Sequence, residues 1–178
     1  MKWILDRLEL WRKVRGLDIT QGFEFNLDTQ CSFVFEEIGV EYLRAKNEYE
    51  KVDALCDTFV YQTNGLSLLY RGIENFLSAY EQSKNKKYNL KASDILINTS
   101  VCLSGDMDKV ESFVVNSIAC IKGIESMGYD FNKCMEETLK EIESRKGAFN
   151  PDTGKWEKFK DEESQKLWYK ADYESCKL

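Results

Sequence analysis

Proline is absent from the first 150 residues of this 178-residue chain, and the single proline is Pro151. Because proline removes a backbone N–H and clashes with the preceding turn, a stretch without it can form long helices. Apolar residues recur at helical spacing through this stretch, and no segment shows the alternation of a half-buried strand. The sequence therefore predicts an all-α fold, a helical bundle of about five to six helices with an extended C-terminal arm.

Glycine and asparagine residues mark the ends of the expected helices. Gly16 follows the first helix, Asn26 or Asp28 caps the second, and Asn47 separates the second from the third. We expect the third helix to bend near Asn64-Gly65 and a loop to occupy 84–91. The predicted helices span residues 2–15, 27–46, 48–83, 92–103, 106–127 and 130–146.

The apolar periodicity stops at Gly147. Residues 1–146 are therefore expected to form the helical domain. Residues 147–178 are expected to form an arm of the same domain, irregular apart from one turn near 161–169. We expect the bundle to fold without this arm.

Composition excludes several classes of function. The chain has 25 basic and 31 acidic side chains and a net charge of −6, which argues against nucleic acid as its partner. No run approaches the ~20 apolar residues that span a bilayer, so we expect no membrane partner. Histidine is absent, which excludes Ser-His-Asp and Cys-His catalysis and HExxH zinc sites. The six cysteines form no CxxC pair and are expected to be reduced core residues of a cytoplasmic protein.

Acidic residues flank the apolar stripe of two successive helices. In 27–46, Glu37 and Glu41 lie about 100° and 60° from the stripe centred on Ile38, whereas Glu36 points to the opposite side. In 48–83 one shoulder of the stripe carries three acids and an amide, namely Glu50, Asp53, Asp57 and Asn64.

The short connection at Asn47 should pack the two helices antiparallel, so that the two rows of carboxylates converge. Crowded like charges beside a core are costly, and a cation would relieve them. Oxygen ligands without His or Cys suit Mg²⁺ or Mn²⁺. The residues alone leave a second interpretation open, a non-catalytic helical interaction module with a solvated acidic face.

The segment Glu37-Ile-Gly-Val-Glu41, followed by Glu50-Lys-Val-Asp53 and Asp57, resembles the signature of the all-α nucleoside triphosphate pyrophosphohydrolases. These are the MazG-like and phosphoribosyl-ATP pyrophosphohydrolase-like proteins, including phage-type members. Their signature is EExxE followed on the next helix by ExxD, and together the two motifs hold Mg²⁺. The second half is intact here as Glu50-xx-Asp53. In the first half, Val40 stands where the third acid is expected and Glu41 comes one residue later.

The arm carries a second similarity to the same proteins. Ser144-Arg145-Lys146 and Gly154-Lys155-Trp-Glu-Lys158 resemble C-terminal segments that approach the substrate phosphates. The resemblance implies substrate contacts from Asn64, Arg145, Lys146, Lys155 and Lys158. For recognition of the base, the aromatic candidates are Trp3, Trp11, Phe23 and Trp156.

The activity implied is Mg²⁺-dependent cleavage of the α–β phosphoanhydride of a (deoxy)nucleoside triphosphate or related nucleotide, releasing a monophosphate and pyrophosphate. One carboxylate without a metal bond would take the proton of the attacking water, and Glu37 and Glu41 are the catalytic candidates. The expected partners are a small nucleotide substrate and further copies of the chain, as a dimer or tetramer. The expected metal ligands are Glu37, Glu41, Glu50, Asp53 and Asp57.

Overall fold

The computed structural model describes residues 1–86, 91–152 and 155–178 and confirms the all-α prediction. The α-helices are α1 (Lys2–Lys13), α2 (Leu27–Glu36), α3 (Glu48–Ser67), α4 (Gly72–Ser83), α5 (Ala92–Ser104), α6 (Lys109–Ser126), α7 (Phe131–Ser144) and α8 (Glu162–Lys166). Short helical turns span Ile19–Gln21 and Glu174–Cys176, and a π-helical turn, Glu37–Tyr42, continues α2. Two strands, β1 (Gly147–Asn150) and β2 (Lys155–Lys158), form an antiparallel hairpin.

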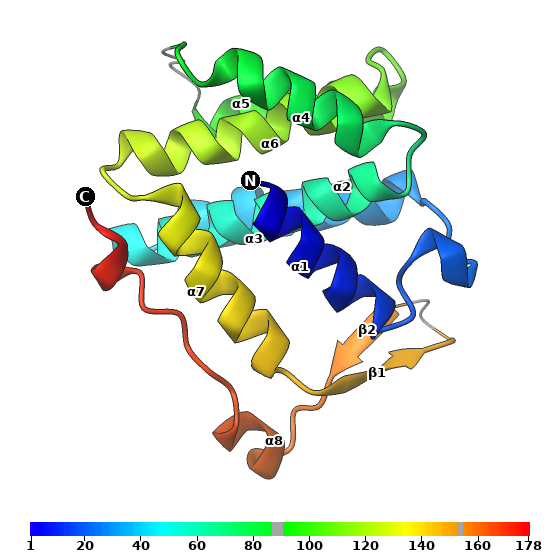
Figure 1. Ribbon diagram of the computed structural model, residues 1–178, viewed down its shortest axis with the longest axis vertical. Coiled ribbons are helices and arrows are strands. Elements are labelled where there is room, and N and C mark those ends of the chain that lie inside the picture. Colours follow the sequence, from blue (N-terminus) through cyan, green and yellow to red (C-terminus); the bar gives the residue numbers. More distant parts are fainter. Residues whose placement is uncertain (87–90, 153–154) are drawn as a thin grey trace.

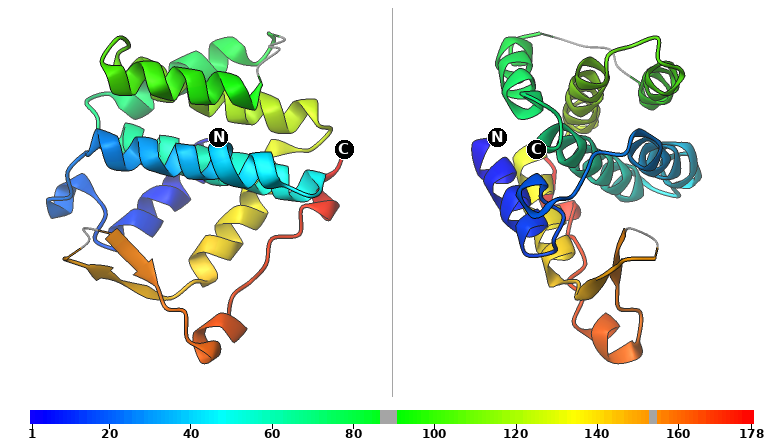
Figure 2. Two further views of the ribbon diagram at one scale, coloured as in Figure 1. Left: turned by 180° about the vertical axis from the view of Figure 1, so that it is seen from behind. Right: turned by 90° about the vertical axis from the view of Figure 1, so that its right-hand side faces the viewer.

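Helix α3 lies at the centre of the bundle. Helices α4, α5 and α6 lie on one side of α2 and α3, and α1 and α7 cross on the other side (Figures 1 and 2). Val52, Cys56, Phe59 and Leu66 of α3 are buried and join residues from α1, α2, α4, α6 and α7 in one core. The side chains of Asn26 and Asn47 cap α2 and α3, accepting hydrogen bonds from the N–H groups of Thr29 and Glu50.

The expected helix 48–83 and the bend expected within it are both wrong. The expected helix 48–83 is two helices, because the chain turns at Leu68–Arg71 and Arg71 adopts φ 55°. Gly72 allows this reversal, since a Cβ there would lie 2.2 Å from the carbonyl oxygen of Leu66. Helix α3 continues without a break through Asn64-Gly65. Four residues of the expected loop at 84–91, residues 87–90, lie outside the described part of the chain.

The C-terminal arm is more ordered than expected. The turn expected near 161–169 is α8, but β1 and β2 pair in a hairpin with Ala148 opposite Glu157 and Phe149 opposite Trp156. The end of the arm returns to the bundle, where Tyr173 is 6% exposed and Cys176 is 1% exposed. The arm therefore contributes to the core, contrary to the expectation that the bundle is complete without it.

All six cysteines are buried and unpaired, as predicted. Within the described residues, no helix combines the length and apolar character needed to cross a membrane.

Candidate functional site

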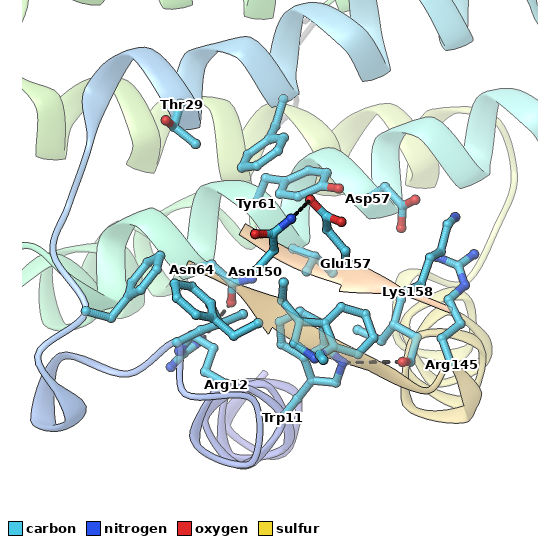
Figure 3. Close-up of a pocket in the computed structure, with 18 of the residues that line it drawn as sticks. Trp11, Arg12, Thr29, Asp57, Tyr61, Asn64, Arg145, Asn150, Glu157 and Lys158 are labelled. Atoms are coloured by element: carbon cyan, nitrogen blue, oxygen red, sulfur yellow. Dashed lines mark hydrogen bonds between the residues drawn. The ribbon is translucent and has the colours of Figure 1, made fainter. Parts of the chain in front are cut away.

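One face of α3 forms the floor of a cavity of about 910 Å³. Asp57, Tyr61 and Asn64 follow one another at helical spacing, so all three side chains line the same space. Figure 3 shows Asp57 at one end of this row and Asn64 at the other, with Tyr61 between them. Phe33 of α2 stacks on the ring of Tyr61 at a centroid distance of 4.3 Å.

The hairpin and α1 form the opposite wall. Trp156 of β2 lies beside Trp11 of α1, with 6.3 Å between ring centroids. The guanidinium of Arg15 lies over both rings, 4.5 Å from the centroid of Trp11 and 4.7 Å from that of Trp156. These contacts hold the arm against the first helix, so segments far apart in the sequence close one cavity.

A cluster of partly buried carboxylates occupies the end of the cavity near Asp57. Burial raises the pKa of Glu37 to about 7, and the charge of Asp53 adds to the shift. Burial also raises the pKa of Asp57 well above its ordinary value, with further contributions from Asp53 and Glu37. Within the described residues Asp57 forms no hydrogen bond or ion pair. The convergence of the two acidic rows is thus seen for Glu37, Asp53 and Asp57.

Asp53 is held by a residue from the far end of the chain. The hydroxyl of Tyr173 donates to Asp53 Oδ1 at 2.7 Å and lies 3.0 Å from the hydroxyl of Thr138. This hydrogen bond lowers the pKa of Asp53, but burial outweighs it and the net shift is upward. The arm therefore fixes the orientation of a carboxylate on the central helix.

Two cationic side chains face Asp57. Figure 3 shows Arg145, at the end of α7, and Lys158, on β2, on the same side of the cavity as Asp57. Arg145 forms an ion pair with Glu141 and lowers the pKa of Glu37 and Asp57. Burial and the charge of Arg145 lower the pKa of Lys158. Their positive charges make this end of the cavity suited to an anion that bridges them.

The predicted site residues differ in where the structure places them. Four of them line the cavity, namely Asp57, Asn64, Arg145 and Lys158. Two more, Glu37 and Asp53, lie close enough to Asp57 for their charges to raise its pKa. Glu41 and Lys146 are exposed and do not line the cavity. The side chain of Lys155 lies outside the described part of the structure.

Glu50 was expected to be a metal ligand, but in the structure its carboxylate forms hydrogen bonds at the start of α3. It lies in the first turn of α3, and its carboxylate accepts hydrogen bonds from the N–H of Lys46 at 2.6 Å and from the side chain of Asn47 at 3.1 Å. With the reciprocal bond from its own N–H to Asn47, it caps the helix. This position is exposed and separate from the cavity lining.

The π-helical turn offers a physical reason for the one-residue offset in the first acidic motif. A π turn holds one residue more than an α turn. The turn spans Glu37–Tyr42, the segment in which Glu41 comes one residue late. Glu41 is exposed, yet its charge still raises the pKa of Glu37.

The donor set is chemically suited to Mg²⁺, because carboxylate oxygens are hard ligands and several negative charges meet here. Among the described residues, no three Asp, Glu, Cys or His side chains are grouped closely enough to enclose a metal ion by themselves. Mg²⁺ is commonly held by one or two carboxylates together with waters and substrate phosphates. The residues therefore fit an ion shared with a substrate better than a closed protein cage.

No protein-family model, curated protein or solved structure matches this chain. The geometry of the cavity and the chemistry of its side chains are therefore the grounds for any assignment of function.

Sequence reasoning did not identify several residues of the site. Arg12 and Gln30 line the cavity, and Glu141 and Tyr173 hold Arg145 and Asp53. A signal for Arg12 existed, because it follows Ile4 and Leu8 at helical spacing and so interrupts an apolar stripe with a charge. Tyr173 gave no signal, since nothing in the tail indicates which helix it meets. Of the aromatic candidates, Trp11, Phe23 and Trp156 line the cavity, and Trp3 does not.

Proposed function

We propose that this protein is a Mg²⁺-dependent nucleotide pyrophosphohydrolase that acts in the cytoplasm as a homo-oligomer, the assembly that the resemblance implies. The observation that carries the proposal is the meeting of partly buried carboxylates with two cations at one end of a large aromatic cavity. Carboxylates that repel one another support a divalent cation, and the cations beside them support a phosphate group. The similarity of the acidic motifs to the MazG-like proteins supports the same reaction.

In this proposal Asp53 and Asp57 hold Mg²⁺, Glu37 lies beside them without a metal bond, and Glu41 is a further candidate ligand. When bound, Mg²⁺ would neutralise phosphate charge and lower the pKa of a bound water. Tyr173 keeps Asp53 oriented, and Arg145 and Lys158 offset the charge of the triphosphate. The substrate lies along α3 with its phosphates beside Asp57.

The reaction is attack of water on the α-phosphorus and rupture of the α–β phosphoanhydride bond, which gives a nucleoside monophosphate and pyrophosphate. The proton of the water passes to a carboxylate. Glu37 is suited to this step, because its pKa of about 7 places it near the pH at which a general base works best.

The test is pyrophosphate release from a panel of ribo- and deoxynucleoside triphosphates, with and without Mg²⁺. We expect release with Mg²⁺ only. Asp57→Asn should reduce the rate of pyrophosphate release more than about 100-fold. Loss of a residue that only supports a metal ligand costs roughly 10–100-fold, and loss of a ligand itself should cost more. The metal-free variant should melt at the same temperature as the wild type or higher, because a repelled carboxylate is removed.

Glu36→Gln is the matched control, since Glu36 is an exposed acid of the same motif. It should retain more activity than Glu37→Gln. Equal loss in both variants would mean that Glu36 also holds the metal. If no triphosphate yields pyrophosphate, the proposal fails and a non-catalytic interaction module becomes the better interpretation.

A further inference from the structure

The end of the cavity away from Asp57 is lined by polar side chains of a different kind. Figure 3 shows Arg12 and Asn64 on the side opposite Arg145 and Lys158. Gln30 of α2 lines the same cavity. Its Oε1 lies close to Gly65, the residue that follows Asn64, at 3.5 Å from the position that a Cβ on Gly65 would take. Three helices thus bring a guanidinium and two amides together.

Two of these side chains are buried without adequate partners. Gln30 is 7% exposed, and within the described residues its amide forms no hydrogen bond. Arg12 is 6% exposed, and in the described part of the chain no carboxylate pairs with it and its Nε has no acceptor. Leaving polar groups unsatisfied away from water is costly, so these residues are poorly explained as part of the core.

The orientation of the Asn64 amide is set by Arg12. A guanidinium N–H of Arg12 donates to Asn64 Oδ1 at 2.8 Å. The amide NH₂ of Asn64 is then left as a donor, and it has no partner among the described residues. Together with the remaining N–H groups of Arg12, this gives the end of the cavity an excess of donors. The amide of Gln30 can present either its oxygen or its nitrogen by rotating about its terminal bond.

We propose that this end binds a planar heterocycle through a carbonyl oxygen and the ring N–H beside it, the pattern of a keto base such as uracil, thymine, hypoxanthine or guanine. The carbonyl would accept from Asn64 and Arg12, and the ring N–H would donate to Gln30. An amino base in the same place would direct its NH₂ group toward groups that also donate. This inference rests on the proposed function, because it names the substrate class of the same cavity.

The dimensions along α3 agree with this arrangement. Asp57 and Asn64 are seven residues apart on one helix face, which corresponds to about 10 Å along the axis. A nucleotide laid along this face would have its base beside Asn64 and its phosphates beside Asp57. Tyr61, between them, offers an aromatic surface for the nucleoside.

The test compares nucleoside monophosphates that differ only between a keto and an amino pattern. Binding of UMP against CMP, and of IMP against AMP, is measured by calorimetry on the full-length protein without metal. We expect the keto member of a pair to bind about tenfold more tightly, the discrimination of a well-placed hydrogen-bond pair. The pyrimidine and purine pairs also distinguish a small from a large base.

Gln30→Leu should weaken binding of the keto monophosphates about tenfold, because it removes the acceptor of the ring N–H. Gln62→Leu is the matched control, because Gln62 is 0% exposed, neither atom of its amide has a partner among the residues that the structure describes, and it does not line the cavity. This control should leave binding of the keto monophosphates unchanged. Asn64→Asp provides a second variant that keeps a partner for Arg12, and it should reverse the preference because an acceptor replaces a donor.

Equal binding within both pairs, or no binding of any of the four, would overturn the inference. So would binding of the keto monophosphates that is unaffected by Gln30→Leu, or a keto preference that survives Asn64→Asp. The proposed function fails separately. A keto preference without pyrophosphate release would refute the proposed hydrolase activity and support the base site. Pyrophosphate release without a keto preference would support the activity and refute the base site.

Discussion

At the scale of single residues, Glu37 gives the molecule a distinctive pH response. Its pKa is raised from 4.5 to about 7, chiefly by burial, with Asp53, Glu36 and Glu41 adding to the shift and Arg145 opposing it. Between pH 4.5 and about 7 the folded protein binds more protons than the unfolded chain. The free energy of unfolding therefore falls as the pH rises through this interval. The raised pKa values of Asp53 and Asp57 act in the same direction.

We therefore expect the metal-free protein to melt at a higher temperature near pH 5.5 than near pH 8. Each group contributes at most about 1.4 kcal/mol per pH unit, and each kcal/mol corresponds to about 2–4 °C in a chain of this size. Saturating Mg²⁺ should flatten the trend, because a bound cation favours the ionised carboxylates. Melting curves by circular dichroism at several pH values test this. A melting temperature that rises with pH over this interval would contradict the electrostatics of the cluster.

Several residues of the acidic cluster were predictable because their placement is a property of single helices. Projection onto an ideal helix put Glu37, Asp53 and Asp57 beside buried stripes, and the structure brings these three together. Projection also placed Glu41 with them, but the π-helical turn changes the angle per residue and Glu41 is exposed. The contacts of Glu141 and Tyr173 with the site depend on which helix and which tail segment pack against α3. A pattern along the sequence does not contain this information.

At the scale of elements, the hairpin has a turn signal in the sequence. Asn150-Pro151-Asp152 is a typical turn sequence, and the segments on either side of it pair as β1 and β2. The tail was expected to be irregular because its strands are short and only partly apolar. Their pairing depends on Trp156 packing against Trp11 and Arg15, which the sequence does not reveal.

Gly147 allows this hairpin to close over the cavity. A Cβ at this position would lie 2.2 Å from the carbonyl oxygen of Glu157 and 2.5 Å from the ring of Trp156. Gly147→Ala should therefore push β2 away from the cavity and displace Lys158. We expect KM for the nucleotide to rise about tenfold or more, since displacements of about 1 Å at a site have effects of up to 100-fold.

The melting temperature of Gly147→Ala should change little, because the hairpin lies at the edge of the bundle (Figure 1). Gly105→Ala is the control, since Gly105 has φ 87° and does not line the cavity. That control should lower the melting temperature and leave KM unchanged. An unaltered KM in Gly147→Ala would mean that the hairpin does not position the substrate.

At the scale of the whole molecule, the C-terminus links the core to the site. Tyr173 and Cys176 are buried, the N–H of Asp130 donates to the carbonyl of Cys176 at 2.9 Å, and the N–H of Leu178 donates to the carbonyl of Gly128 at 2.9 Å. The last residues thus close the bundle between α6 and α7, while the hydroxyl of Tyr173 reaches Asp53. Stability and site geometry depend on one short segment.

Truncation after Lys170 should therefore destabilise the protein by about 3–5 kcal/mol, the cost of removing a large buried aromatic side chain. Tyr173→Phe separates the two roles, because it keeps the ring in the core and removes only the hydroxyl. It should cost about 1 kcal/mol in urea unfolding, the net value of one hydrogen bond. It should also raise the pKa of Asp53 further, since the hydrogen bond from Tyr173 lowers that pKa. If the truncated protein unfolds at the same urea concentration as the full chain, the arm only covers the cavity and the core is complete within residues 1–170.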